Sequence, residues 1–330
     1  MTAPLLELRG LSRDFAQPAT LLEQAARRVS SATRWQPRKV HAVDDVSLRL
    51  DAGQTLGLVG ESGCGKSTVA RLVAGLITPT KGEILVRGRP IDTLSPAERL
   101  KIQMVFQDPY SSLNPRMRLG AQLAEAVRVH AIVPRSEAES YLRQVFGDCG
   151  IDPVLAERYP HQVSGGQRQR FGIARALAMQ PDLILCDEPV AALDVSIQAQ
   201  IINLFMTLQR QRGLSYLFIS HDLTVVRHLS QQVAVMYLGR IVEQGSAAQV
   251  LGAPVHPYTR ALWQAAPRIS ASRQTHTPIK GEIPSPLAPP PGCHFHPRCP
   301  LVEASCKTGR IALRDVGAGQ RAACILAEPG

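Results

Sequence analysis

The stretch GESGCGKST, Gly60–Thr68, decides the fold. It follows the apolar segment TLGLVG, which is typical of a strand, and a helical pattern runs from Gly65 to Leu76. G-x-x-x-x-G-K-[ST] between a strand and a helix is a phosphate-binding loop, in which backbone N–H groups and the helix dipole supply positive potential. We therefore predict a nucleotide site, with Lys66 on the β- and γ-phosphates and Ser67 on Mg²⁺.

A second motif, LILCDEP at Leu183–Pro189, is an apolar strand that ends in two acids. Carboxylates at the carboxyl end of a strand lie where ligands bind in open α/β sheets. We expect Asp187 to bind Mg²⁺, and Glu188 to orient and polarise the attacking water as general base. The alternative is that the two acids only end a strand.

The order of elements predicts an α/β protein. The apolar segments LILCD, YLFIS and VAVMYL are each separated by a helical pattern, which indicates a largely parallel sheet covered on both faces. The expected units are a nucleotide-binding domain over 1–268, with a helical subdomain inserted at about 119–178, a Pro-rich linker over 269–292, and a small Cys-rich appendage over 293–330.

The composition limits the class of protein. The chain is 45% hydrophobic and 19% charged, as expected of a folded protein. It has no run of about eighteen apolar residues that could span a membrane. The N-terminus becomes charged too early for a secretory signal, so we expect a cytoplasmic protein. The net charge of +10 is compatible with nucleic acid, nucleotides or an anionic membrane surface.

A third motif, SGGQ at Ser164–Gln167, has the composition of an anion-binding turn at a helix start. Together with the phosphate loop and CDEP, it resembles the signature of the ATP-binding cassette (ABC) family. The resemblance implies a P-loop ATPase with a mainly parallel core, an antiparallel β subdomain and an inserted helical subdomain. It also implies that Ser164, Gly165, Gly166 and Gln167 meet the ATP bound by an opposite subunit. A plain helix cap at Ser164 is the alternative.

Other positions match the same family. The resemblance makes Gln107, in VFQDP, the Q-loop residue that contacts the metal and water and connects to a transmembrane partner. It makes His221, in ISHDL, the switch histidine at the γ-phosphate, and it places Asp194, in AALDVS, near the opposite site. The family commonly has Ser where this chain has Ala191, which puts one hydrogen bond between subunits in doubt.

The resemblance also implies an aromatic residue stacked on adenine. Phe15, in LSRDFAQ, is the first candidate, Trp35 is its rival, and a core position for Phe15 is the alternative. The residues expected at ATP and Mg²⁺ are Phe15, Gly60, Glu61, Ser62, Gly63, Cys64, Gly65, Lys66, Ser67, Thr68, Gln107, Ser164, Gly165, Gly166, Gln167, Asp187 and Asp194, with Ser67, Gln107 and Asp187 on the metal and Glu188, His221 and Gln107 catalytic.

A narrower resemblance concerns three longer segments. FQDPYSSLNPRM, EPVAALDVSIQAQIINL and HPYTRAL are similar to ATPase subunits of oligopeptide and dipeptide importers, and nickel importers share much of the pattern. The insert between Phe15 and His41 resembles the second of the two unlike ATPases of such systems. The resemblance implies a non-identical ATPase partner, two transmembrane permease subunits, a solute-binding protein, and a peripheral place on the cytoplasmic face of the inner membrane.

Nucleic-acid-associated members of the family are the competing class. DNA-repair members place a long coiled coil between the phosphate loop and the signature, whereas this segment is short and lacks sustained heptads. Ribosome-associated members carry two cassettes in each chain, and this chain has one phosphate loop and one signature. We therefore expect no nucleic-acid partner.

The tail carries cysteines with the spacing C-x5-C-x6-C-x17-C. Such thiolates can hold zinc or an iron–sulfur cluster, and the lack of C-x-x-C weakens a zinc ribbon. Several peptide-importer ATPases carry a [4Fe–4S] cluster in this tail, so the resemblance implies a cluster, with zinc or reduced thiols as alternatives. The expected ligands are Cys293, Cys299, Cys306 and Cys324, with His294 and His296 also available.

Overall fold

The computed structural model describes residues 3–17, 38–108, 113–265, 279 and 281–327. Within this part of the chain, an eight-stranded core sheet has the order β11-β12-β10-β9-β3-β8-β7-β6. Five of its strands run parallel: β3 (Thr55–Val59), β6 (Ile102–Val105), β7 (Leu183–Asp187), β8 (Ser215–Ser220) and β9 (Gln232–Tyr237). The remaining three continue the sheet in antiparallel fashion: β10 (Arg240–Ser246), β11 (Arg314–Gly317) and β12 (Gln320–Ala322).

A second, antiparallel sheet has four strands in the described residues, in the order β2-β1-β4-β5. These are β1 (Leu6–Ala16), β2 (Lys39–Leu50), β4 (Lys81–Val86) and β5 (Arg89–Pro90). The α/β class, the mainly parallel core and the antiparallel subdomain are thus confirmed. The parallel strands are apolar runs because helices or the second sheet bury both of their faces.

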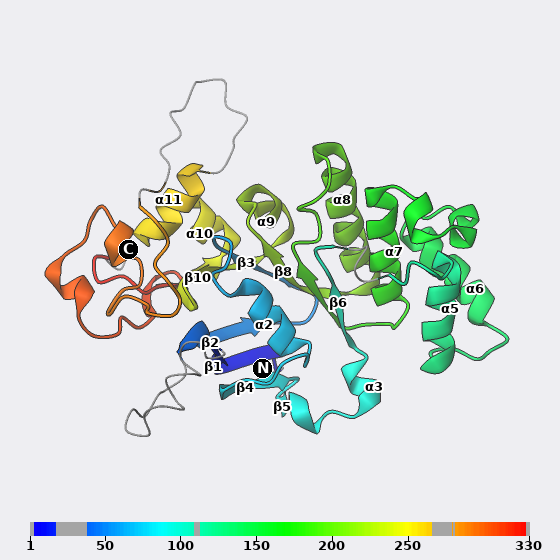
Figure 1. Cartoon of the computed structure of the whole chain (residues 1–330), viewed down its shortest axis with the longest axis horizontal. Helices are drawn as coiled ribbons and strands as arrows, with labels where there is room; N and C mark the ends of the chain where they lie inside the picture. The colour runs from blue at the N-terminus through cyan, green and yellow to red at the C-terminus, as the bar shows by residue number, and fades with distance from the viewer. Residues whose placement is uncertain (1–2, 18–37, 109–112, 266–278, 280, 328–330) are drawn as a thin grey trace, which may run out of the picture.

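Some helices connect the strands, and others form a separate group. They are α2 (Lys66–Val73), α3 (Pro96–Arg99), α5 (Leu119–Val129), α6 (Ala138–Asp148), α7 (Gly165–Leu177), α8 (Val195–Arg212), α9 (Leu223–Leu229), α10 (Ala247–Gly252) and α11 (Pro257–Ala265), with 3₁₀ turns η1 (Ile91–Thr93), η2 (Pro153–Glu157), η3 (Pro160–Gln162), η4 (His296–Arg298) and η5 (Ala304–Lys307). Figure 1 shows α5, α6 and α7 together at one end of the molecule, as expected of an inserted helical subdomain.

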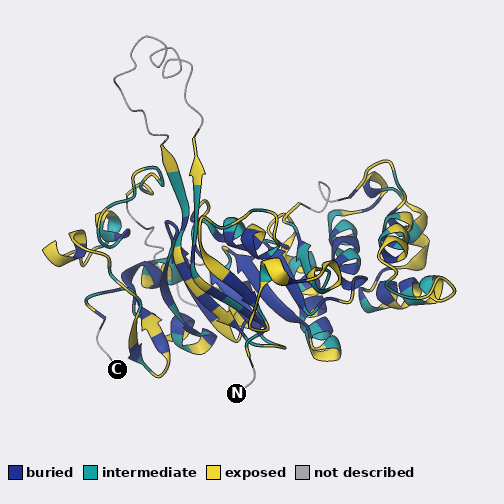
Figure 2. Ribbon diagram, turned by 90° about the horizontal axis from the view of Figure 1, so that it is seen from below, coloured by how far each residue is buried: buried dark blue, intermediate teal, exposed yellow. Residues whose placement is uncertain are grey.

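The core lies on both faces of the central sheet. Successive side chains of β7 point to opposite faces, so Leu183 and Leu185 pack with α2 and the small sheet, whereas Ile184 and Cys186 pack with α7, α8 and α9. Figure 2 shows the buried residues concentrated along the core strands. The carboxyl ends of the parallel strands are therefore held rigidly from both sides.

Helix α2 ends three residues before the predicted end at Leu76. Gly75 has φ +69°, and the N–H of Leu76 donates to the carbonyl of Arg71. This is a left-handed helix end of the kind that glycine favours. The apolar periodicity of the sequence continues beyond Val73, but Gly75 ends the helix.

The C-terminal region, expected as a small appendage behind a linker, is joined to the core sheet. Glu243 of β10 pairs with Ala322 of β12, and Figure 1 shows this region beside β10. The buried carboxylate of Glu243 accepts hydrogen bonds from the N–H groups of Val255 and His256 and from the Gln320 amide. A single carboxylate thus ties the core strand to two later segments.

Acid should destabilise this junction. Burial lowers the pKa of His256 to about 3, and Arg260 adds to the effect. Because this is below the value of about 6.5 in the unfolded chain, the unfolded state binds the proton first and stability falls as pH drops below 6.5. We expect the free energy of unfolding to fall by about 1.4 kcal/mol from this group between pH 7.5 and 5.5.

Urea denaturation at the two pH values measures this loss, and His256→Asn should remove that part of it. The matched control is His228→Asn, since His228 is exposed on α9. An unchanged pH dependence in His256→Asn would contradict the assignment.

Candidate active site

The phosphate loop leaves the carboxyl end of β3 and enters α2. Gly65 precedes the helix with φ +111°, and a Cβ there would lie 2.1 Å from the carbonyl oxygen of Ala42. Only glycine fits this close approach. Gly63, with φ +77°, has no atom within 4 Å of its Cβ position, so it borders open space. The loop is therefore packed on one side and open on the other.

The ammonium group of Lys66 is held inside this loop. Nζ donates to the carbonyl oxygens of Gly60 at 2.8 Å and Glu61 at 2.9 Å, and it lies 3.9 Å from Oε1 of Glu188. The side chain is buried. The loop carbonyls hold this cation beside the Glu188 carboxylate, and the backbone N–H groups of a phosphate loop add positive potential that favours a phosphate ligand.

Ser67 and Asp187 meet behind the loop. The Ser67 hydroxyl donates to Oδ1 of Asp187 at 2.8 Å. Burial raises the pKa of Asp187, and the charge of Glu188 raises it further, while the bond from Ser67 opposes the shift. A divalent cation would lower this pKa again, and hydroxyl and carboxylate oxygens are ligands that Mg²⁺ accepts. These two predicted metal ligands do fit the ion.

Glu188 is the centre of the site. Its backbone has φ +49°, a left-handed conformation that is uncommon for a residue with a side chain, and its N–H donates to the carbonyl of Ile219 on β8. Oε2 accepts from the Gln107 amide at 3.4 Å and lies 3.1 Å from Nδ1 of His221, which must carry a proton to donate here. The ends of β6, β7 and β8 thus bring the three predicted catalytic residues together.

The signature motif is elsewhere. Ser164 caps α7, accepting from the Gln167 N–H at 3.3 Å, while the Gln167 side chain accepts from the Ser164 N–H at 2.9 Å. A Cβ at Gly166 would lie 2.6 Å from Cγ2 of Ile197, so the start of α7 packs closely on α8. Figure 1 shows α7 well apart from α2. The structure therefore does not bring the signature to the phosphate loop of the same chain.

The remaining nucleotide candidates have different surroundings. Phe15 lies on β1 with 36% of its surface exposed, and the Arg13 guanidinium lies 4.7 Å from its ring centroid. A core position for Phe15 is therefore wrong. Trp35, its rival, is outside the described residues. Asp194 is exposed at the start of α8, next to Val195, which is 82% exposed.

The structure does not support the expected metal centre in the cysteine tail, as far as its residues are described. The thiols of Cys293, Cys299, Cys306 and Cys324 are near enough to influence one another's pKa values. Burial raises the pKa of Cys293 to about 11, and neighbouring thiols add to this shift.

The geometry of the described side chains also gives no support for metal coordination. In the part of the chain that the structure describes, no three His, Cys, Asp or Glu side chains are arranged to hold a metal ion. Nδ1 of His294 is bonded to the carbonyl of Leu238, and Nδ1 of His296 to that of Cys293. The [4Fe–4S] prediction is not supported, and zinc ligation is not supported either.

Two residues at the phosphate loop have no counterpart in the sequence prediction. The Glu61 N–H donates to the hydroxyl of Tyr258 at 2.9 Å, and the Glu61 carboxylate binds the guanidinium of Arg298. Tyr258 lies in HPYTRAL and Arg298 in HPRC, both visible as motifs. Their partners are about two hundred residues away in the chain, so no local pattern connects them to Glu61.

No helix among the described ranges is both long enough and apolar enough to cross a membrane.

Two family models match the chain. A model described as ABC transporter matches residues 43–191, and one described as oligopeptide/dipeptide transporter, C-terminal region, matches 242–306. The oligopeptide transport ATP-binding protein OppF of Escherichia coli is 50% identical over 288 residues, covering 84% of this chain and 86% of that protein. AppF of Bacillus subtilis, also an oligopeptide transport ATP-binding protein, is 45% identical over 330 residues, covering 98% and 97%.

Solved structures agree on the fold. The cbiO1 structure from Clostridium perfringens, part of the ABC transporter complex cbiONQ, has a TM-score of 0.62 and 25% identity, covering 76% of this chain and 92% of that one. A dimeric ATP-binding cassette in a post-hydrolysis state with ADP and Pi has a TM-score of 0.60 and 24% identity, covering 73% and 98%.

Removing the buried ammonium should weaken nucleotide binding. We expect Lys66→Ala to raise the Kd for ATP at least about 10-fold, since a hydrogen bond to a charged group contributes roughly 1.5–3 kcal/mol. Titration with a fluorescent ATP analogue measures the affinity, with Lys81→Ala on the exposed start of β4 as the control. Equal affinities for both variants would refute the role of Lys66.

Proposed function

This chain belongs to the ATP-binding subunits of peptide ABC transporters, and on that premise we propose that its described active site is one half of an ATP-hydrolysing site that powers peptide import. The observation that carries the proposal is the convergence of Gln107 and His221 on Glu188, beside Lys66, while the signature lies apart at an exposed helix start. The chain has both parts of an ATP site, but not facing each other.

The side chains of the site have different roles in this proposal. Lys66 binds the β- and γ-phosphates. Ser67, Asp187 and Gln107 would hold Mg²⁺, and the ion would supply positive charge to the phosphate oxygens. Glu188 orients the water as general base. Its position is set by the left-handed backbone of its own residue and by the two side chains that contact its carboxylate.

His221 has a separate task in this scheme. Its ring is largely exposed, while its Nδ1 faces the carboxylate of Glu188. A ring that is fixed on one side and open on the other can contact both Glu188 and the γ-phosphate. We therefore assign it to sensing the terminal phosphate.

The signature completes the site of a partner subunit. The N–H groups at the start of α7 and the Ser164 hydroxyl form an anion-binding helix end. Asp194 and the 82% exposed Val195 lie on the adjacent start of α8, where a partner would cover them. We propose a second, non-identical ATPase as this partner, so that ATP joins the two chains.

The membrane-facing partners come from the type of transporter. Relatives carry oligopeptide transport in their printed names, and this supports a di- or oligopeptide as cargo. We propose two transmembrane permease subunits and a solute-binding protein as the other components, and a peripheral place for this chain on the cytoplasmic face of the membrane. Val129 on α5 and Val154 on η2 are exposed apolar side chains of the helical subdomain, and we propose that the permease subunits dock on this subdomain.

The general base can be tested alone. We expect Glu188→Gln to bind ATP with wild-type affinity but to lose at least about 100-fold in turnover, because the amide cannot accept the proton of the water. ATPase assays of the assembled importer give the rate. Size-exclusion chromatography with light scattering should show that ATP stabilises the dimer of the variant with its partner ATPase. Hydrolysis at the normal rate would rule out Glu188 as the base.

The half-site arrangement makes a different prediction. Ser164→Ala should lower ATP turnover in the assembled importer, yet leave the ATP affinity of the isolated chain unchanged, because that chain's own phosphate loop is intact. Ser140→Ala, on the exposed part of α6, is the matched control. A loss of ATP affinity in the isolated Ser164 variant would mean that the signature serves its own chain.

A further inference from the structure

Glu61, the second residue of the phosphate loop, is held from three directions. Its carboxylate accepts two hydrogen bonds from Arg298, from Nη1 to Oε2 at 2.7 Å and from Nη2 to Oε1 at 3.1 Å. Its N–H donates to the Tyr258 hydroxyl at 2.9 Å, and its carbonyl accepts from Nζ of Lys66 at 2.9 Å. One residue therefore links the C-terminal part of the chain to the phosphate-binding lysine.

The ion pair between Glu61 and Arg298 is shielded from water. The Arg298 side chain is 5% exposed and the Glu61 side chain 22%. Paired, fork-like hydrogen bonds between a guanidinium and a carboxylate are geometrically specific, and removing one partner leaves the other charge poorly solvated. The contact thus constrains both the place and the orientation of Glu61.

The two supporting residues are themselves fixed by an aromatic cluster of Tyr237, Tyr258 and Phe295. The ring centroids of Tyr237 and Tyr258 are 4.6 Å apart, and Phe295 lies 5.3 Å from each. Phe295 precedes the turn η4, which carries Arg298, and Arg298 also donates to the Tyr237 hydroxyl at 3.4 Å. Arg298 and Tyr258 therefore reach Glu61 from a rigid, buried base.

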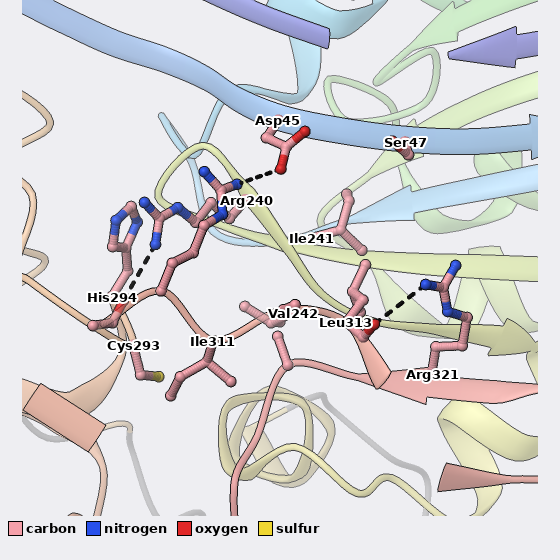
Figure 3. A pocket seen from close by; sticks show the side chains of 14 residues that line it. Asp45, Ser47, Arg240, Ile241, Val242, Cys293, His294, Ile311, Leu313 and Arg321 are labelled. Carbon is pink, nitrogen blue, oxygen red and sulfur yellow. Dashed lines mark hydrogen bonds and ion pairs between the residues drawn. The ribbon is translucent and has the colours of Figure 1, made fainter. Parts of the chain in front are cut away.

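The C-terminal region does not depend on Glu61 for its own attachment. Besides the pairing of β12 with β10, the guanidinium of Arg310 binds Oδ1 of Asp44 at 3.2 Å and Oδ2 of Asp45 at 3.0 Å. These contacts lie beside a cavity of about 220 Å³, and Figure 3 shows Asp45 facing the guanidinium groups next to His294. This second attachment can be removed without touching the phosphate loop.

We propose that Arg298 and Tyr258 are positioning residues of the nucleotide site. They fix the peptide unit of Glu61, whose carbonyl in turn directs the Lys66 ammonium into the loop before ATP arrives. The inference rests on the proposed function, because that function assigns Lys66 to the phosphates. A preorganised site binds its ligand more tightly than one that must be ordered on binding.

The effect should fall on ATP binding rather than on the chemical step. We expect Arg298→Gln to raise the Kd and the KM for ATP about 10-fold, equivalent to about 1.4 kcal/mol. The kcat should stay within about twofold, since Arg298 makes none of the described contacts of Glu188. Arg298→Lys should recover part of the affinity, and Tyr258→Phe should weaken binding by a smaller factor.

A double-mutant cycle tests the route through Glu61. The Kd is measured for the full chain with a fluorescent ATP analogue, and KM and kcat are measured in the assembled importer. Glu61→Gln should match Arg298→Gln, and the double variant should be no weaker than either single variant, because all three lose the same contact. If Arg298→Gln does not fold, the Kd of Glu61→Gln tests the same contact.

Arg310→Gln is the matched control, because it removes ion pairs from the same region without reaching the loop. It should leave the Kd for ATP unchanged. Wild-type affinity in a folded Arg298→Gln chain, equal losses in Arg298→Gln and Arg310→Gln, or additive losses in the cycle would each overturn the proposal. Failure of the wild-type chain to bind ATP would instead overturn the proposed function.

Discussion

The site depends on one buried positive charge. The Lys66 ammonium is desolvated inside the phosphate loop, where carbonyl oxygens of the loop hold it and the Glu188 carboxylate lies 3.9 Å away. A buried cation of this kind is costly unless an anion completes its surroundings. The glycines beside it follow from the same requirement, because the backbone must curve tightly around the phosphates and leave one side open.

The parallel sheet supplies the rest of the chemistry through its geometry. The segments that follow β6, β7 and β8 supply Gln107, Glu188 and His221, and the carboxyl ends of parallel strands meet at one edge. Glu188 adopts an unfavourable backbone conformation there, which the packed strands on both sides can sustain. The signature, by contrast, belongs to the helical subdomain. This separation is the physical reason for proposing that a second subunit completes the active site.

The C-terminal region is connected to the ATP site by direct contacts. Its strands extend the core sheet, and Glu243 joins it to β10 at a buried position. Arg298 links this region to Glu61 at the phosphate loop through its ion pair. The cysteines around Arg298 are close to one another but are not placed as metal ligands in the described structure. The contacts of Arg298 and Tyr258 with Glu61 are the basis for the role we propose for this region, which is support of the loop.

The sequence by itself determined the fold class, the phosphate loop and the identity of the residues around Glu188. Each of these depends on short-range patterns: an apolar strand, a glycine-rich turn, and acids at a strand end. Only the tertiary structure decided that the C-terminal region extends the core sheet and that Arg298 and Tyr258 hold Glu61. Those contacts join residues about two hundred positions apart, and long-range pairing leaves no periodic trace in either segment.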